Sequence, residues 1–268
     1  AISWTPENFS QKSNTESFTE KFQKLENQFD SVFTQKFPNS NQFPKFYQTA
    51  LSNMLSGFGY WHGHFRVKKP NDKPENEQIC EATELFSACP SRPQFPRGFL
   101  WDEGFHLLLI WKWDPNLAKK SLSSWFNRMQ ASGWIPREQI LGYEAESRVP
   151  GEFIPQIMDN ANPPTLFLVV DQMLKENRGV EDLEFIESLF PRLEKWYQWM
   201  YFSQQSEKNS EDFYWKGRSE NTDLRELNPK TLTSGLDDFP RASHPDNYER
   251  HIDMKCWLIF GAKIWSHF

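Results

Sequence analysis

Apolar side chains recur at three- and four-residue steps along most of the chain, which is the spacing of one face of an α-helix. Phe18, Phe22 and Leu25 begin this pattern, and it resumes after each of several breaks that contain Gly or Pro. Helices are therefore predicted at about 18–33, 43–58, 104–113, 114–129, 163–173, 183–200 and 247–263.

Three local signals refine these helices. Asp114 followed by Pro115 is the pattern of an N-cap and a first-turn proline, so a helix is predicted to begin there. Pro191 lies inside a periodic segment and predicts a kink or a restart. The charged stretch 66–80 contains two prolines and is predicted to be a surface loop.

No segment alternates apolar and polar residues as a half-buried strand does, so the predicted fold class is all-α. Long loops rich in Gly and Pro separate the helices at 87–104, 132–163 and 203–247, and loops of this length usually carry function. Many helices with long loops favour an α/α toroid over a four-helix bundle, whose loops are short. Residues 1–16 are polar and are predicted to be a linker before a single domain, 17–268.

Composition excludes some functions and leaves others open. The chain has 268 residues, a formal charge of −6 and no long basic block, which argues against binding to nucleic acid or to an anionic membrane. No apolar run is long enough to span a bilayer. Aromatic residues make up 16% of the chain. An acidic, aromatic-rich composition fits a carbohydrate site, but it fits a large aromatic core equally well.

Cysteines and histidines show no spacing typical of a zinc site, so neither a metal nor another cofactor is expected. Cys80 and Cys89 flank a loop-like stretch and are candidates for a disulfide in an oxidising compartment, which would leave Cys256 unpaired. Asn8 begins a glycosylation sequon.

Residues 97–106 combine an arginine, a tryptophan, two carboxylates and a histidine. Helix capping explains a carboxylate here, because Asp102 and Glu103 suit the positive N-terminus of the next helix. Capping does not explain Arg97 and Trp101. A sugar needs an apolar platform for its C–H face and charged groups for its hydroxyls, and this segment supplies both.

Two other acidic segments are candidates for chemistry. Asp237 and Asp238 are adjacent, and like charges raise the pKa of one carboxyl, as a general acid requires; a capped turn with solvated aspartates is the alternative. Glu249 and Asp253 are four residues apart and share a helix face, where Arg250 or bound hydroxyls would offset their repulsion. A solvated charged turn is the alternative there.

Five segments, in order and at compatible spacing, resemble glycoside hydrolase family 63, the processing α-glucosidases. The resemblance runs from about residue 43 to the end of the chain. The segments are Phe95–His106, Arg137–Gly142, Ala161–Thr165, Ser234–Pro245 and Glu249–Trp257.

The resemblance implies the N-terminal part of an (α/α)6 toroid catalytic domain, preceded in the family by a β-sandwich domain. It implies an inverting exo-α-1,2-glucosidase without a cofactor. The expected substrate is the triglucosylated high-mannose N-glycan on nascent glycoproteins, from which the terminal glucose is removed. The expected location is the lumen of the endoplasmic reticulum, in a type II membrane protein whose anchor lies outside this chain. No membrane contact is expected from this segment.

The resemblance also assigns roles to residues. The first Asp of the Ser-Gly-Leu-Asp-Asp motif is the family's general acid, which falls on Asp237. The family often has Leu-Arg where this chain has Met254 and Lys255, so the last motif matches less strictly. The residues expected to bind substrate are Arg97, Trp101, Asp102, Glu103, Glu138, Asn162, Asp238, Glu249, Arg250, His251 and Asp253.

The family's catalytic base is a glutamate far downstream of this motif, and no matching motif occurs before Phe268. Inverting hydrolysis needs an acid and a base roughly 6.5–9.5 Å apart. The chain is therefore expected to be a fragment that needs the C-terminal half of the same domain and is inactive alone. Two alternatives stay open: a toroid with trehalase-like specificity, and a carbohydrate-binding module without catalysis.

Overall fold

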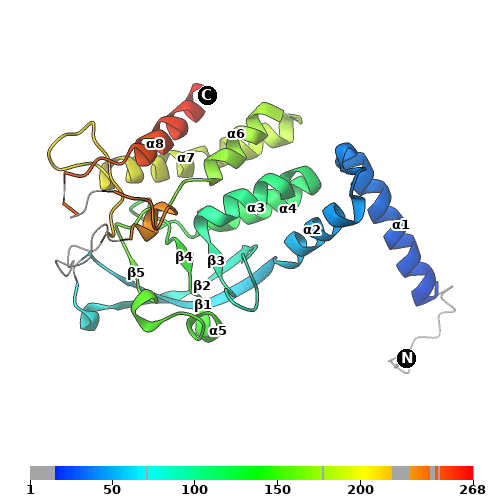
Figure 1. The fold of residues 1–268 in the computed structure, drawn as a ribbon, viewed down its shortest axis with the longest axis horizontal. Helices are drawn as coiled ribbons and strands as arrows, with labels where there is room; N and C mark the ends of the chain where they lie inside the picture. The colour runs from blue at the N-terminus through cyan, green and yellow to red at the C-terminus, as the bar shows by residue number, and fades with distance from the viewer. Residues whose placement is uncertain are drawn as a thin grey trace. The chain divides into compact units, whose positions relative to one another are not determined.

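The computed structural model describes residues 16–70, 72–176, 178–218, 230–241, 245–246 and 248–267 (Figure 1). The chain falls into two compact units that divide between Ala50 and Leu51, and each is described by itself. The predicted linker lies outside the described residues except for Glu16.

The first unit contains helix α1 (Phe18–Lys36), a short 3-10 turn η1 (Pro38–Ser40) and the beginning of helix α2 (Pro44–Ser56). Both helices were predicted. A capping box begins α1: the Ser17 hydroxyl accepts a hydrogen bond from Glu20 N, and the Glu20 carboxylate accepts one from Ser17 N. These two bonds satisfy N–H groups that a helix otherwise leaves unpaired at its N-terminus.

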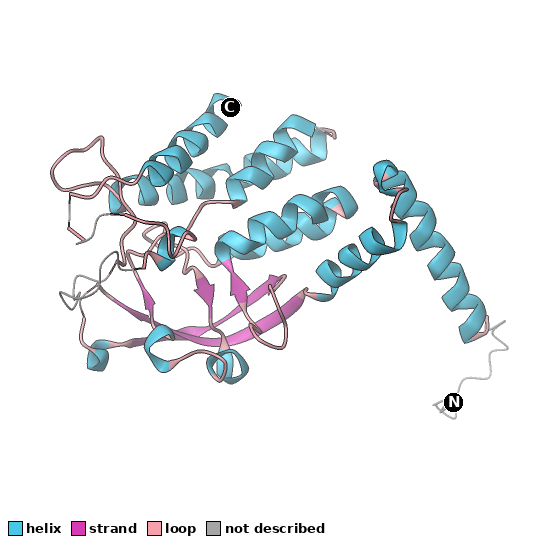
Figure 2. Ribbon diagram, in the orientation of Figure 1, coloured by secondary structure: helices cyan, strands magenta, loops and turns pink. Residues whose placement is uncertain are grey.

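The second unit contains a β-sheet that the sequence analysis did not predict (Figure 2). Strand β1 (Gly59–Lys68) pairs antiparallel with β2 (Gln78–Ser87), and β5 (Gln156–Ile157) pairs parallel with β1. The all-α prediction is therefore wrong in this part, and the predicted surface loop 66–80 is restricted to the connection between β1 and β2. The chain remains mostly helical.

The alternation of β1 is present in the sequence but is interrupted. Trp61, Phe65 and Val67 are buried at even spacing, but Gly63 occupies the position between the first two. The strand register also shifts between Gly63 and Phe65. A glycine stands where an apolar residue would continue the alternation, and the bulge shifts the register beside it. Too few apolar residues therefore alternate for a strand to be recognised from the sequence.

Besides the end of α2, the described part of the second unit contains six α-helices: α3 (Leu100–Trp113), α4 (Pro115–Asn127), α5 (Gly142–Glu146), α6 (Leu166–Glu176), α7 (Val180–Ser203) and α8 (Ile252–Ile264). As predicted, Asp114 caps α4, because its carboxylate accepts a hydrogen bond from Leu117 N. Helix α7 continues through Pro191 without a restart.

The core of this unit lies among these helices and the sheet. Trp111, Trp125 and Trp196 are almost completely buried, so much of the aromatic content serves packing. Helices α3 and α6 lie side by side (Figure 1). A Cβ added to Gly104 would lie 2.2 Å from the Thr165 hydroxyl oxygen, so only glycine permits this close approach.

Two predicted boundaries move. Helix α3 begins at Leu100 and not near residue 104, which places the predicted carbohydrate-binding carboxylates in its first turn. Helix α8 begins at Ile252 and not near residue 247. His251 precedes it in an extended conformation because its N–H donates to the Phe213 carbonyl.

The three cysteines are free thiols. Cys80 lies in β2 and Cys89 follows the end of that strand, so about nine residues of nearly extended chain separate them. At ~3.3 Å per residue this is roughly 30 Å. A disulfide needs Cα atoms at about 4.4–6.8 Å, so this pair is not bridged.

Candidate active site

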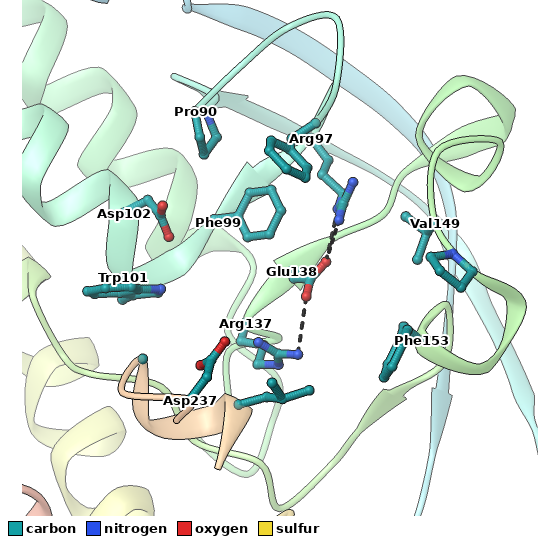
Figure 3. A pocket seen from close by; sticks show the side chains of 14 residues that line it. Pro90, Arg97, Phe99, Trp101, Asp102, Arg137, Glu138, Val149, Phe153 and Asp237 are labelled. Atoms are coloured by element: carbon teal, nitrogen blue, oxygen red, sulfur yellow. Dashed lines mark hydrogen bonds and ion pairs between the residues drawn. The ribbon is translucent and has the colours of Figure 1, made fainter. Parts of the chain in front are cut away.

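A pocket of about 390 Å³ lies where the first turn of α3 meets three other segments (Figure 3). These are the short strand pair β3 (Gly98–Phe99) and β4 (Glu138–Gln139), the segment that contains η3 (Gly151–Phe153), and the loop after η4 (Leu232–Ser234). The lining residues are Pro90, Phe95, Arg97, Phe99, Trp101, Asp102, Arg137, Glu138, Val149, Pro150, Phe153, Leu232, Gly235 and Asp237.

Five of the predicted site residues meet in this pocket although they come from three distant segments. Arg97, Trp101, Asp102, Glu138 and Asp237 all line it. Figure 3 shows the carboxylates of Asp102 and Asp237 directed toward a common space beside the Trp101 ring. The pocket thus offers carboxylates next to an aromatic face.

The β3–β4 pair brings Arg97 and Glu138 together, because Phe99 lies opposite Glu138 in the ladder. Arg97 donates from Nε and Nη2 to Glu138 Oε2, each at 2.9 Å, and Arg137 Nη2 lies 3.2 Å from Glu138 Oε1. The guanidinium of Arg97 also covers the Phe99 ring. Both oxygens of Glu138 are therefore engaged by arginines, which fixes the wall of the pocket.

Asp102 and Glu103 are neighbours in the first turn of α3 but lie in different surroundings. Burial raises the pKa of Asp102, an effect that the nearby His106 opposes, and Asp102 Oδ2 is buried without a hydrogen-bond partner among the described residues. Glu103 does not line the pocket. Its carboxylate is fully buried and accepts hydrogen bonds from Ala88 N and the Ser121 hydroxyl, while Oε2 lies 3.0 Å from His106 Nδ1.

Asn162 lies behind the pocket and not on its surface. Its Oδ1 accepts a hydrogen bond from Trp101 N at 3.3 Å, and its Nδ2 donates to the Thr233 carbonyl at 3.0 Å. Asn162 does not cap the next helix, because α6 begins at Leu166. The amide of Asn162 instead joins the segment that carries Trp101 to the loop that carries Asp237.

Asp237 lies in a loop that packs against Trp101. Gly235 has φ of 72°, and a Cβ there would lie 3.2 Å from the Trp101 ring, so this turn requires glycine. The Asp237 carbonyl accepts a hydrogen bond from Thr231 N. Asp238, in contrast, is exposed, forms an ion pair with Lys230 and does not line the pocket.

The four predicted residues of the last motif do not line the pocket. Arg250 is exposed and forms an ion pair with Asp212 at 2.8 Å. Glu249 is buried against Arg218, and His251 Nε2 lies 3.4 Å from its carboxylate. Burial alone would raise the pKa of Glu249, but the contacts with His251 and Arg218 bring it below its ordinary value.

Asp253 is the centre of a second group of contacts. Arg241 donates to both of its oxygens, at 2.9 and 2.8 Å, and Trp215 Nε1 donates to Oδ2 at 2.8 Å. Burial favours a raised pKa for Asp253, but the hydrogen bonds from Arg241 and Trp215 lower it overall. His251 Nδ1 accepts a hydrogen bond from Trp215 N, so the two groups of contacts are connected.

Several pocket residues were not predicted as site residues. Arg137 lines the pocket and directly precedes Glu138, which was predicted as a site residue. Its position next to Glu138 was the sequence signal that pointed to it. Val149 and Phe153 line the pocket from a segment whose charged residues Arg148 and Glu152 directly precede them, so a signal was present in the sequence there as well. In the described residues there is no cluster of three or more His, Cys, Asp or Glu side chains that would hold a metal ion. None of the described helices combines the length and the apolar character of a membrane span.

Residues 9–268 match the model of the glycosyl hydrolase family 63 C-terminal domain. The chain belongs to glycosyl hydrolase family 63. Proteins with similar sequences include a mannosyl-oligosaccharide glucosidase of Arabidopsis thaliana, 44% identical over 90% of this chain and 30% of that protein. An alpha-glucosidase 2 of the same plant is 45% identical over 80% of the chain and 28% of that protein. The mannosyl-oligosaccharide glucosidase of Saccharomyces cerevisiae is 34% identical over 80% of this chain and 32% of that protein. The chain thus spans about a third of the length of these relatives.

Proposed function

We propose that this chain is the N-terminal part of the catalytic domain of an inverting exo-α-1,2-glucosidase with an (α/α)6 toroid. In this proposal the protein removes the terminal glucose from the triglucosylated N-glycan precursor. The family match and the relatives named mannosyl-oligosaccharide glucosidase support it. Those names also support an assignment to N-glycan processing in the endoplasmic reticulum, with any membrane anchor outside this chain.

The observation that carries the proposal is the meeting of Asp237, Asp102 and Trp101 in one pocket. A glucose unit presents C–H groups on one face and hydroxyls around its edge. The Trp101 ring offers an apolar surface for the C–H face, and the carboxylate of Asp102, which lines the pocket, offers an acceptor for a hydroxyl. Arg97, Glu138 and Arg137 shape the opposite wall.

Asp237 has the role of general acid in the proposal. It protonates the glycosidic oxygen as the bond to the anomeric carbon breaks, so that the aglycone leaves as an alcohol. A water attacks the opposite face of the sugar and gives its proton to a general base. Glu138 does not suit the role of base, because both of its oxygens already bind arginines. The proposal takes the base from a glutamate outside this chain, as the family resemblance implies.

Replacement of Asp237 by asparagine in the full-length protein tests this role. A general acid contributes about 10²–10⁴-fold to the rate, so glucose release from the triglucosylated glycan is expected to fall at least a hundredfold. Binding of the glycan is expected to change little, because Asn has nearly the shape of Asp. The matched control is Glu187→Gln, an exposed position on α7. Retention of more than about one-hundredth of the activity by Asp237→Asn contradicts the role.

The substrate is tested separately with wild-type protein. We expect glucose release from the triglucosylated N-glycan and from the α-1,2-linked disaccharide kojibiose, but not from trehalose. Preference for trehalose supports the trehalase-like alternative. Binding of the glycan without turnover supports a carbohydrate-binding module.

A further inference from the structure

The loop 230–241, here called the acid loop, carries Asp237 and is held mainly near its two ends. At its beginning, Thr231, Thr233 and Ser234 are buried, and Asn162 binds the Thr233 carbonyl. Leu236–Pro240 are exposed. The middle of the acid loop therefore has little packing of its own, and its position depends on how each end is attached.

Arg241 attaches the second end. Its side chain is only 4% exposed, and its two terminal nitrogens donate to the two oxygens of Asp253. Asp253 lies in the first turn of α8, and Trp215 Nε1 donates to the same carboxylate. A two-point ion pair of this kind fixes orientation as well as distance. The acid loop is thus tied to a helix of the core.

The carboxylate of Asp253 has its oxygens engaged by protein donors, and it does not line the pocket. This arrangement differs from the substrate-binding role that the family resemblance implies for this motif. A group that binds sugar hydroxyls presents acceptors to the pocket, and Asp102, unlike Asp253, lines it.

We infer that Asp253, acting through Arg241, is a positioning residue that holds the acid loop so that Asp237 reaches the glycosidic oxygen. This inference rests on the proposed role of Asp237 as general acid. Proton transfer requires heavy atoms within about 2.6–3.2 Å of each other. A displacement of about 1 Å can reduce a rate about a hundredfold. The ion pair Arg241–Asp253 is expected to affect catalysis in this way without contact with the sugar.

The test compares two substrates that differ in their need for an acid. Kojibiose has a sugar leaving group that must be protonated, whereas α-glucosyl fluoride releases fluoride with little help from an acid. In the full-length protein, Asp253→Asn and Arg241→Lys are expected to lower kcat for kojibiose about 10- to 100-fold. For each variant, kcat for α-glucosyl fluoride is expected to stay within about threefold of wild type, and KM for both substrates within about twofold, because the glucose pocket is unchanged.

Three comparisons make this test decisive. The double variant is expected to lose no more than the worse single variant, because both residues act through one ion pair. Lys255→Gln, an exposed change on the same helix, is expected to behave as wild type. Turnover of the fluoride shows that a variant is folded, and Arg241→Lys, which keeps the charge, remains informative where Asp253→Asn does not fold.

The outcomes separate this inference from the proposed function. Equal losses of kcat on both substrates, with a raised KM, mean that Asp253 contributes to sugar binding. An unchanged kcat for kojibiose means that Asp253 does not position the acid. Either result overturns the inference. Asp237→Asn is measured in parallel. If that variant keeps its activity on kojibiose, the proposed function itself fails. If it loses kojibiose turnover alone, the acid role stands, and the Asp253 result is judged by itself.

Discussion

Asn162 shows how much of the candidate site depends on single residues outside the pocket. Its amide joins Trp101 N to the Thr233 carbonyl in a buried position. Trp101 and the acid loop form adjacent walls of the pocket, and the two hydrogen bonds fix their separation. An asparagine suits this task because one side chain supplies both a donor and an acceptor.

Replacement of Asn162 by alanine is expected to lower the free energy of unfolding by about 1–3 kcal/mol, because the partly buried Trp101 N–H and the buried Thr233 carbonyl lose their hydrogen bonds. Urea denaturation measures this difference. Asn116→Ala, at an exposed position on α4, is the control and is expected to change stability by less than about 0.5 kcal/mol. Equal effects of the two substitutions would show that the Asn162 bridge contributes nothing.

Neighbouring residues also show the limit of sequence inference at this scale. Asp102 and Glu103 both suit the first turn of a helix, and the motif contains both. Only the packing of α3 shows that Asp102 faces the pocket while Glu103 faces Ser121 and Ala88. Successive residues of a helix point about 100° apart, so a different packing of the helix would exchange their surroundings.

Among the elements, the helices and the cap of α4 were the most predictable part. Their signals are local: apolar residues at three- and four-residue steps, and an Asp-Pro pair at the beginning of α4. The β1–β2 pair was missed because Gly63 and the register shift interrupt its alternation. Strand pairing depends on a partner elsewhere in the chain, and for β5 that partner is about ninety residues away.

The cap of α4 provides a prediction at the scale of an element. Asp114→Ala removes the acceptor for Leu117 N, and it is expected to lower the free energy of unfolding by about 1 kcal/mol. Asp114→Asn keeps an acceptor oxygen at the same place and is expected to retain most of this stability. Thermal unfolding followed by circular dichroism compares the two variants. If Asn is as destabilising as Ala, the stabilisation does not come from the cap.

At the scale of the whole molecule, buried and partly buried ion pairs join segments that are distant in sequence. Arg218 and Glu249 connect residues on either side of the acid loop, and Arg241 and Asp253 connect that loop to α8. Each pair includes a carboxylate whose pKa lies below its ordinary value. The folded state of this region is therefore favoured when these carboxylates are ionised.

This linkage predicts a loss of stability in acid. Glu249 and Asp253 bind protons less readily in the folded than in the unfolded state. Their contribution to the free energy of unfolding is therefore complete above about pH 4–4.5, and it is lost as the pH falls through their folded-state pKa values. The raised pKa of Asp102 acts in the opposite direction. We expect Tm to fall below pH 4, and to fall less steeply in Asp253→Asn. Parallel Tm curves between pH 3 and 7 would contradict this role of Asp253.

The sequence by itself determined the helices, the cap of α4 and the family, because periodicity, capping and ordered motifs are properties of contiguous residues. It also indicated which segments carry the candidate chemistry. Only the tertiary structure decided which members of those motifs meet. The β3–β4 register brings Arg97 to Glu138, and the Asn162 bridge joins Trp101 to the loop that carries Asp237. Arg241 links the same loop to Asp253, which does not line the pocket. These are contacts between residues far apart in the chain, so no local pattern encodes them.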